Sequence, residues 1–549
     1  MNDISVLTGG RAGDGINSAG LLVAHLFNQL GYQTYMYFDY PSLIKGGHNF
    51  TITRAAEKKI GAHRDRCDYL LALSQDSIDL HRNLISESTI VLFDSGRVHG
   101  EGQGIPVEEI LKAEKAPGVM GNSCIIGAFA KASGIPFGVV ETVIRRQIPK
   151  DPEKNLVVAR KGYEAVREER VIPLAGDTCC PLLTGNELIG LGLLHGGLDA
   201  YVAYPMTPTS NLLHFLAGAA RDFPITVVHP ENEIAVMLMA LGFSFAGKKT
   251  AVGTSGGGFC LMTEGFSFAG ASEIPVVVVM GQRTGPSTGL PTYTGQTDLQ
   301  FILHAGQGEF PRLVVAPGDP EQAYVWSSIA LSLAWECQVP AVILVDKTLC
   351  EATYSLDEKA ITVPDTGTPE PPGDSGPYRR YALTGSGISP LRYPPFRGSP
   401  IKVNSYAHDE TGITTENADM VVQMTEKRQK KALSLRSEIE ALECVKTFGK
   451  NDAKQAVLCW GSTLLVCREV AESLGIRVIQ PVVLSPFPEE TLKKALSGIK
   501  HLVVIEENAY GQLRMLCSQH GIMIDHHVAK LDGRPFSVEE LGARLKEVI

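Results

Sequence analysis

The sequence has few of the features that mark membrane, secreted or nucleic-acid-binding proteins. Its longest apolar run, IPVVVVMG at 274–281, is far shorter than the ~20 residues that cross a bilayer. The N-terminus begins with a strand-like ISVL and a glycine loop, without the basic and apolar regions of a signal peptide. The formal net charge of −10 gives no electrostatic support for binding nucleic acid. These absences predict a cytoplasmic protein that binds neither membrane nor nucleic acid.

Cysteine is present, but its spacing favours neither a cluster nor a disulfide framework. The chain has 11 cysteines without a C-x-x-C spacing, and the one close pair is Cys179-Cys180. An iron–sulfur cluster normally draws four thiolates from short repeated spacings, and disulfides are rare in the cytoplasm. The polar residues of HDETG (408–412) are consecutive in one loop, whereas metal ligands converge from different segments. We therefore expect solvated loop residues there and no metal site in this chain.

Short β-branched runs alternate with helical stretches along most of the 549 residues. This alternation predicts an α/β fold, because parallel strands are joined by crossover helices. The length is too great for one core. We expect three parallel-sheet α/β domains at residues 1–178, 184–365 and 454–549. A connector at 366–453, rich in Pro and Gly and then forming a charged helix, would lie across the other domains.

The strand-like YVAYP is followed by a threonine between two prolines, in YPMTPTS (204–210). Fixed backbone angles on both sides would hold the Thr207 hydroxyl in one direction, which suits a group that positions a substrate. An ordinary strand-to-helix turn with a capping Thr or Ser is the structural alternative.

The segment HPENEIAVM (229–237) places Glu231 and Glu233 at the start of a helix whose body is nearly all apolar. Carboxylates are favoured near a helix N-terminus, so first-turn capping explains them without any function. The apolar body predicts a helix buried on all sides, which would also remove Glu233 from solvent. A buried carboxyl group needs a partner, and the aminopyrimidine ring of thiamine is a suitable one.

Two Gly-rich segments also follow strands. GTSGGGFC (253–260) permits close approach of the backbone to a ligand, and it is not a Walker motif because no G-K-[ST] follows. GQRTGPSTGLPTYTGQTDL (281–299) is dense in Gly, Thr and Ser and has Arg283 as its only cation. An Arg at the C-terminal edge of a sheet suits a bidentate grip on a carboxylate. A structural ion pair with one of the preceding glutamates is the alternative.

The N-terminal loop TGGRAGDGINSAG (8–20) matches two cofactor fingerprints only in part. Its glycines do not form G-x-G-x-x-G, and its GDG lacks the downstream Asn-Asn of the thiamine diphosphate–Mg²⁺ motif. We interpret the GDG as coincidental and expect that this chain cannot hold the diphosphate and Mg²⁺ in the usual way. An NAD-linked dehydrogenase built on residues 1–178 is an alternative reading, as is a non-catalytic scaffold that keeps the fold.

Taken in order, these segments resemble the alpha subunit of 2-oxoacid:ferredoxin oxidoreductases over nearly the whole chain. YPMTPTS resembles the family's YPITP motif, HPENEIAVM its glutamate-bearing helix, and TSGGGFCLMTEG its TSGPG-type loop. QRTGPSTGLPTYTGQTDL with GQGEFPRLVVAPGD is the most specific match. CWGS (459–462) and VVIEENAYGQL (503–513) resemble a transketolase C-terminal-type domain. Residues 1–178, with GGRAGDGINSAG and SLIKGGHN, resemble a gamma subunit fused in front of alpha.

The resemblance implies that residues 184–365 bind the pyrimidine of thiamine diphosphate, which is shared with a beta subunit. That partner would carry the GDG…NN motif, Mg²⁺ and a [4Fe–4S] cluster, in a dimer of alpha–beta heterodimers. The implied reaction is oxidative decarboxylation of a 2-oxoacid, with coenzyme A and ferredoxin. 2-Oxoglutarate is favoured as the acid, because GQRTGPSTG and QGEFPR look most like enzymes that use it. Pyruvate, branched-chain 2-oxoacids and arylpyruvate are the alternatives.

Carried onto matching positions, the resemblance assigns roles to individual residues. Glu233 would bind the aminopyrimidine, while Thr207 and Arg283 would orient the 2-oxoacid, Arg283 through its carboxylate. The further residues expected around the cofactor are Pro205, Thr254, Ser255 and Gly256.

Overall fold

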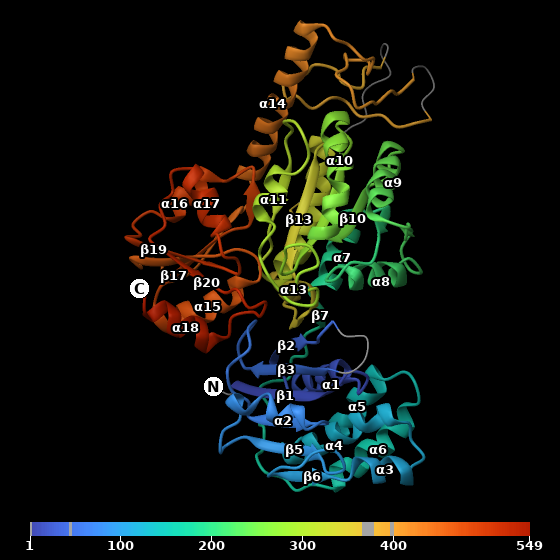
Figure 1. Ribbon diagram of the computed structural model, residues 1–549, viewed down its shortest axis with the longest axis vertical. Helices are drawn as coiled ribbons and strands as arrows, with labels where there is room; N and C mark the ends of the chain where they lie inside the picture. Colours follow the sequence, from blue (N-terminus) through green and yellow to red (C-terminus); the bar gives the residue numbers. More distant parts are fainter. Residues whose placement is uncertain (1–2, 43–46, 365–377, 396–399) are drawn as a thin grey trace. The chain divides into compact units, whose positions relative to one another are not determined.

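The computed structural model describes residues 3–42, 47–364, 378–395 and 400–549 (Figure 1). Parts of SLIKGGHN and of the Pro- and Gly-rich connector, which the sequence singled out, lie outside these residues. None of the described helices combines the length and hydropathy that a membrane span requires.

The chain divides into two compact units. The N-terminal unit is built on residues 1–184 and also takes in 351–358 and 536–544. The second unit is formed by residues 185–350, 359–535 and 545–549.

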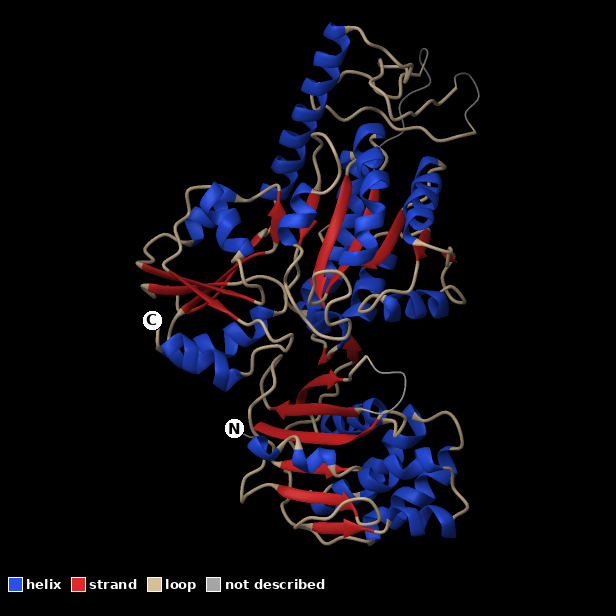
Figure 2. Cartoon of the chain, in the orientation of Figure 1, coloured by secondary structure: helices blue, strands red, loops and turns tan. Residues whose placement is uncertain are grey.

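The N-terminal unit contains an eight-stranded sheet flanked by helices (Figure 2). In spatial order its strands are β6 (Gln103–Ile105), β5 (Ile90–Asp94), β4 (Tyr69–Ala72), β1 (Asp3–Arg11), β3 (His48–Ala56), β2 (Gln33–Asp39), β14 (Thr353–Ser355) and β7 (Leu182–Thr184). Its helices and 3-10 turns are α1 (Ile16–Gln29), α2 (Asp76–Asp79), η1 (Arg82–Leu84), α3 (Val107–Ala113), η2 (Gly118–Met120), α4 (Gly121–Ala132), α5 (Phe137–Gln147) and α6 (Pro152–Glu164). The strands β6, β5, β4 and β1 run parallel, whereas β3, β2, β14 and β7 run antiparallel to their neighbours.

The first strand and helix of this unit follow directly from the sequence. Strand β1 is buried from Ser5 to Gly10, as its apolar residues require. Helix α1 ends before Gly31, which has a positive φ of 80° and donates its backbone N–H to the carbonyl of Asn28. The N–H of Tyr32 bonds to the carbonyl of Phe27, so two terminal carbonyls of the helix are satisfied. The predicted glycine stop is therefore confirmed.

The larger sheet of the second unit has seven strands. Their spatial order is β18 (Val483–Ser485), β12 (Leu313–Val315), β13 (Pro340–Asp346), β11 (Val276–Gln282), β10 (Thr250–Ser255), β8 (Ala200–Ala203) and β9 (Thr226–Val228). All neighbours run parallel except β18, which pairs antiparallel with β12. The helices and 3-10 turn along this stretch are α7 (Gly185–His195), α8 (Ser210–Ala219), α9 (Glu233–Phe245), α10 (Gly256–Ser272), α11 (Leu299–His304), α12 (Pro320–Cys337), α13 (Lys347–Glu351) and η3 (Glu358–Ala360). The side chains of Val276–Met280 are fully buried, which places the core around β11.

The smaller sheet of the second unit has five strands. Their order is β15 (Val445–Gly449), β17 (Arg477–Pro481), β16 (Gln455–Leu458), β19 (His501–Glu506) and β20 (His526–Ala529). The remaining helices of this unit are α14 (Ala418–Glu440), α15 (Thr463–Leu474), α16 (Glu489–Ala495) and α17 (Gln512–Gln519). The last helix, α18 (Val538–Lys546), belongs mainly to the N-terminal unit. Every pair in this sheet is parallel except β15 with β17. The predicted α/β class, with three sheets that contain parallel strands, is confirmed; the two sheets of the second unit are mostly parallel, and the eight-stranded sheet is mixed.

Two short strands pair with sheets that are remote from them in sequence. β14 follows the last parallel strand of the seven-stranded sheet along the chain, yet it pairs with β2 and β7. β18 follows β17 directly, yet it joins the edge of the larger sheet through β12. Both pairings join segments that we assigned to different parts of the chain. The domain boundaries themselves remain a prediction.

Within the predicted connector, residues 378–395 lack regular secondary structure and pack on other elements. The hydroxyl of Tyr381 donates to the carbonyl of Ser272 over 3.2 Å, and the Arg380 guanidinium donates to the carbonyl of Glu273 over 2.6 Å. The buried Glu273 carboxylate accepts from Lys427 Nζ at 2.6 and 2.8 Å, and also from Lys431. These bonds attach α14 and the connector to the end of α10.

Candidate active site

Neighbouring strands of the seven-stranded sheet end together and lead into the segments that the sequence singled out. In the register of the sheet, Ser255 at the end of β10 lies opposite Gly281 of β11, and Ala203 of β8 lies opposite Gly253. Loops that begin at Tyr204 and Arg283 follow β8 and β11, and α10 begins at Gly256 directly after β10. Parallel sheets bind ligands at this edge, because loops and helix N-termini converge there.

The structure brings Thr207 and Arg283, two of the residues that the sequence singled out, into contact. The guanidinium Nη1 of Arg283 donates to the backbone carbonyl of Thr207 over 3.3 Å. Both residues are half-buried. Burial lowers the pKa of Arg283, and the charge of Asp298 opposes that change. Among the described residues, no ion pair within 4.0 Å joins Arg283 to Glu231 or Glu233, so the structure does not support the ion-pair alternative.

Glu233 is the first residue of α9, and its side chain is only 5% exposed, whereas Glu231 is exposed. The N-cap role that could have explained these glutamates belongs to Asn232, whose side-chain oxygen accepts the N–H of Ala235 over 3.0 Å. Among the residues that the structure describes, the Glu233 carboxylate has no hydrogen-bond or ion-pair partner. A buried carboxylate of this kind is costly unless a ligand or partner supplies a donor.

The Glu233 carboxylate lies against the first turn of α10. A Cβ atom placed on Gly258 would come within 2.6 Å of Glu233 Oε1 and 2.3 Å of Thr254 Oγ1. Only glycine fits between these two groups. The glycine in this turn after β10 therefore leaves room for the buried Glu233 carboxylate at the end of the sheet.

The other residues expected around a cofactor surround this turn. Thr254 and Ser255 are fully buried, Gly256 is the first residue of α10, and Pro205 is exposed. The Ser255 hydroxyl is buried and makes no hydrogen bond with the described residues. Together with the unpaired Glu233 carboxylate, this hydroxyl fits a polar ring that can both donate and accept hydrogen bonds.

The prediction that α9 is buried on all sides is wrong for this chain. Its inner face packs on β8, β10 and α10, but Ile234 and Leu238 are 50% and 51% exposed. On α10, Leu261 is also half exposed. A groove of about 1030 Å³ runs along α9, α10 and α11 beside these side chains. These exposed apolar side chains distinguish the outer face of α9 from its buried inner face.

Asp298 belongs to the site, although its position was not singled out in the sequence. Its carboxylate oxygens would lie 3.1 and 3.3 Å from a Cβ placed on Gly256, so it borders the first turn of α10. Its backbone N–H donates to Gln282 Oε1 over 3.1 Å. Burial raises the pKa of Asp298 to about 6, and the charge of Arg283 opposes this rise. The only sequence signal for it is its place in the polar GQTDL stretch.

The loop that carries Arg283 and Asp298 is fixed by the C-terminal sheet. The N–H of Gln296 donates to the carbonyl of Glu507 over 2.9 Å, and the N–H of Glu507 donates to Gln296 Oε1 over 3.0 Å. Gln296 Nε2 also donates to the carbonyl of Trp460 over 2.6 Å. All three residues are buried. The CWGS and IEEN motifs thus position the loop, which explains why they accompany it in the sequence.

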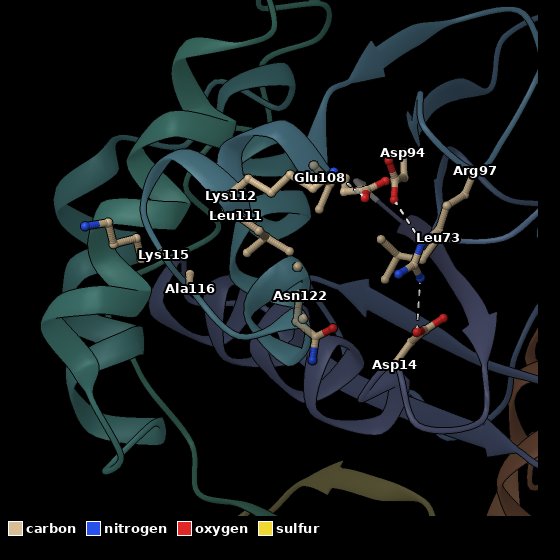
Figure 3. Close-up of a pocket in the computed structure, with 13 residues that line it drawn as sticks. Asp14, Leu73, Asp94, Arg97, Glu108, Leu111, Lys112, Lys115, Ala116 and Asn122 are labelled. Atoms are coloured by element: carbon tan, nitrogen blue, oxygen red, sulfur yellow. Dashed lines mark hydrogen bonds and ion pairs between the residues drawn. The ribbon is translucent and has the colours of Figure 1, made fainter.

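A second cavity, of about 370 Å³, lies in the N-terminal unit beside the ends of β1, β4 and β5 (Figure 3). Its charged lining consists of Asp14, Asp94, Arg97, Glu108, Lys112 and Lys115. Arg97 is bound to Asp14 at 3.2 Å, and Lys112 to Glu108 at 2.8 Å. Acids and bases are equal in number there and mostly pair with each other, so the cavity does not select a charge.

His408 of HDETG is not a solvated loop residue, as was predicted, but is 4% exposed. Its ring packs on Tyr381 with centroids 3.8 Å apart, and Nδ1 bonds to the carbonyl of Tyr406. Packing of the connector on α10 removes it from water. No group of three or more His, Cys, Asp or Glu side chains among the described residues could hold a metal ion.

Two family models match the chain. Residues 192–427 match the thiamine diphosphate-binding model of pyruvate flavodoxin/ferredoxin oxidoreductases, and residues 5–165 match the pyruvate ferredoxin/flavodoxin oxidoreductase model. The first match covers β8 to β13 and hence the whole site described above. The second covers most of the N-terminal unit.

Curated relatives and a solved structure agree with these models. A 2-oxoacid:ferredoxin oxidoreductase subunit alpha of Saccharolobus solfataricus is 29% identical, with 100% of this chain and 98% of that protein aligned. A 2-oxoglutarate synthase subunit of Methanocaldococcus jannaschii is 27% identical over 65% of this chain and 97% of its own length. A 2-oxoglutarate:ferredoxin oxidoreductase structure from Magnetococcus marinus, solved with 2-oxoglutarate, coenzyme A and succinyl-CoA, matches with a TM-score of 0.90, 28% identity and coverage of 100% and 99%.

The fold, the site and these matches define the chain as a subunit of a thiamine diphosphate-dependent oxidoreductase. More particularly, it is similar to the alpha subunits of 2-oxoacid:ferredoxin oxidoreductases, with the pyruvate ferredoxin/flavodoxin oxidoreductase match preceding the thiamine diphosphate-binding match along the chain. The resemblance that the motifs indicated is confirmed.

Gly258→Ala tests the packing of Glu233 on α10. The new methyl group would overlap the Glu233 carboxylate and the Thr254 hydroxyl, so Glu233 must move. We expect oxidoreductase activity of the reconstituted enzyme to fall at least about tenfold, with the melting temperature little changed, because a shift of ~1 Å at such a site is costly. Gly242→Ala is the control, because Gly242 is an exposed position on α9 with open space around it. Equal activity of the two variants would contradict the packing argument.

Proposed function

We propose that this chain, with a beta subunit, catalyses the coenzyme A-dependent oxidative decarboxylation of 2-oxoglutarate to succinyl-CoA and passes the electrons to ferredoxin. The observation that carries the proposal is the unpaired carboxylate of Glu233, buried over a Gly-only turn at the end of the parallel sheet. Thiamine diphosphate supplies the nucleophilic carbon that attacks the keto group and accepts the electron pair when CO₂ leaves.

Glu233 would accept a hydrogen bond from the aminopyrimidine ring. Its position at the N-terminus of α9 and under the first turn of α10 fixes the direction of the carboxylate without occupying its oxygens. Such a hydrogen bond holds the ring in the tautomer that can take up a proton. The buried hydroxyl of Ser255 offers a second polar contact for the ring.

Arg283 and Thr207 would orient the oxoacid. The contact between the Arg283 guanidinium and the Thr207 carbonyl uses one N–H donor and leaves others for a carboxylate. The planar guanidinium group of Arg matches two carboxylate oxygens. The Thr207 hydroxyl belongs to the same residue as the carbonyl that Arg283 contacts. This pair would hold the carboxylate that is lost as CO₂.

The diphosphate, Mg²⁺ and a [4Fe–4S] cluster are assigned to the partner subunit. The half-exposed apolar side chains of α9 and α10 support this assignment, because they line a groove that another chain can cover. We propose a dimer of alpha–beta heterodimers as the assembly.

The choice of 2-oxoglutarate is supported by the relatives named above, two of which act on that acid according to their names. Pyruvate, branched-chain 2-oxoacids and arylpyruvate share the framework and are the alternatives. Steady-state kcat/KM values for these acids, measured with the reconstituted complex, coenzyme A and ferredoxin, decide among them. A complex that prefers pyruvate would refute the assignment of the acid but leave the reaction class intact.

Glu233→Gln is expected to reduce coenzyme A-dependent decarboxylation by at least about 10²-fold, because an amide cannot take the place of the carboxylate in proton transfer. The measurement is the initial rate of ferredoxin reduction by the reconstituted complex at saturating oxoacid. Glu231→Gln is the matched control, since this neighbouring carboxylate is exposed. Near-normal turnover of the Glu233 variant would remove this residue from the thiamine site.

Arg283→Ala is expected to raise the KM for the oxoacid at least about tenfold with a smaller change in kcat, because a bidentate charged contact contributes more than 1.4 kcal/mol. The measurement is a substrate titration with thiamine diphosphate held at saturation. Arg283→Lys should restore the charge but not the fork, and its KM should lie between those of the other two proteins. An unchanged KM in both variants would exclude carboxylate binding by Arg283.

Leu238→Asp tests the partner surface. A charge placed in an apolar interface removes about 1.5–3 kcal/mol of hydrophobic contact, which weakens association at least about tenfold. The dissociation constant of the alpha–beta complex can be measured by analytical ultracentrifugation. Leu433→Asp, at a 66% exposed position on α14, should leave it unchanged. Equal affinity of both variants for the beta subunit would place the interface elsewhere.

A further inference from the structure

The loop between β11 and α11 carries Arg283 at its start and Thr297 near its end, and hydrogen bonds tie the two ends together. The hydroxyl of Thr297 donates to the backbone carbonyl of Arg283 over 3.4 Å. The N–H of Asp298 donates to the side-chain oxygen of Gln282 over 3.1 Å, and Gln282 is buried. The backbone position of Arg283 therefore depends on where residues 297–298 are held.

Residues 297–300 are held in turn by Gln512, the first residue of α17. Its Nε2 donates to the carbonyl of Thr297 over 2.7 Å, and its Oε1 accepts the N–H of Gln300 over 2.9 Å. The side chain of Gln300 also donates to the backbone carbonyl of Gln512 over 3.0 Å. Gln512 is only 8% exposed, so solvent does not readily replace these bonds. One buried amide therefore anchors the segment on which Arg283 depends.

The direction of the Gln512 side chain is fixed by the buried IEEN motif. Oδ1 of Asn508 accepts the N–H groups of Gly511 and Gln512 over 2.8 and 3.1 Å. Nδ2 of Asn508 donates to the Glu506 carboxylate over 2.8 Å, and the same carboxylate accepts the N–H of Leu513 over 2.9 Å. Asn508 and Glu506 are 3% and 0% exposed. The first turn of α17 is thus held to the five-stranded sheet, and Gln512 with it.

We propose that Gln512 is a positioning residue for the 2-oxoacid, because its amide fixes residues 297–298 and thereby sets Arg283 for the substrate carboxylate. The inference rests on the proposed function of Arg283. Among the described residues, the guanidinium of Arg283 makes one hydrogen bond, the 3.3 Å contact with the Thr207 carbonyl. Its placement therefore relies on the backbone from which it extends. The C-terminal sheet contributes to oxoacid affinity by holding that backbone.

The chemistry of the amide explains why a glutamine occupies this position. A glutamine side chain can donate to one backbone group and accept from another at the same time, as Gln512 does with Thr297 and Gln300. An apolar side chain of similar length would leave that carbonyl and that N–H without partners, which is costly in a buried place. The loop would then shift to regain hydrogen bonds, and the backbone of Arg283 would shift with it.

Gln512→Met, made in the full chain and assembled with the beta subunit, tests this role. We expect the KM for the preferred oxoacid to rise about tenfold and kcat to change less than about threefold, because a displaced Arg283 weakens substrate binding. The measurement is ferredoxin reduction over a range of oxoacid concentrations at saturating thiamine diphosphate and coenzyme A. Gln519→Met, at an exposed glutamine on the same helix, should behave as wild type.

A double variant separates positioning from a purely structural role. If Gln512 acts through Arg283, the combination of Gln512→Met with Arg283→Ala should have the KM of Arg283→Ala alone, within about twofold. Two independent effects of about tenfold each would multiply to about a hundredfold. Multiplication of the two effects would overturn the proposal. A lowered melting temperature of Gln512→Met with an unchanged KM would also overturn it, since the amide would then only join the two sheets.

Thr297 offers a second test that leaves Gln512 in place. Thr297→Val removes the hydroxyl that donates to the Arg283 carbonyl and keeps a branched side chain, so we expect the KM for the oxoacid to rise about threefold. Thr297→Ser retains a hydroxyl and should restore the KM to within about twofold of wild type. If Gln512→Met does not fold, this pair decides, and a wild-type KM in Thr297→Val overturns the proposal.

The outcomes separate this inference from the function on which it rests. A raised KM in Arg283→Ala with a wild-type KM in Gln512→Met would overturn the positioning role and leave the proposed function standing. An unchanged KM in Arg283→Ala would overturn the role of Arg283 and this inference with it. A raised KM in both single variants, without a further rise in the double variant, is the result that we expect.

Discussion

The site depends on one steric and electrostatic constraint, which is the burial of the Glu233 carboxylate against a helix turn where only glycine fits. The carboxylate lies 2.6 Å from the place where a Cβ of Gly258 would stand, and no described residue offers it a hydrogen bond. Its burial is therefore imposed by the packing of α9 on α10 and on the end of β10. A bound group that donates a hydrogen bond would give this carboxylate the partner that the described residues do not offer.

Much of this arrangement could be predicted from the sequence, because it depends on local patterns. Short β-branched runs in the sequence indicated the strands that precede YPMTP, GTSGGG and GQRTG. Parallel topology places the ends of these strands at one edge of the sheet. The proximity of Thr207 to Arg283 and the burial of Glu233 follow from that edge and from the apolar helix. Both features agree with the structure.

Other features could not be predicted, because they depend on contacts between distant segments. The sequence around Leu238 does not indicate whether this side chain is covered by this chain or by another. The apolar helix α9 was therefore predicted to be buried on all sides. His408 looked solvated because its neighbours are polar, yet Tyr381 covers it. Asp298 has no flanking pattern of its own, and only its placement against Gly256 and Arg283 makes it part of the site.

The edge strand β18 has a consequence for how such chains can be recombined. Val483–Ser485 leaves the five-stranded sheet and completes the seven-stranded one beside β12, while Gln296 and Glu507 bind each other's backbone across the same junction. A chimaera that exchanges only the C-terminal segment between homologues would replace an edge of the thiamine-binding sheet and, at the same time, the hydrogen-bond partners of the loop that carries Arg283. Such an exchange therefore has to keep residues 483–485 and the partners of Gln296 matched to the sheet that they join.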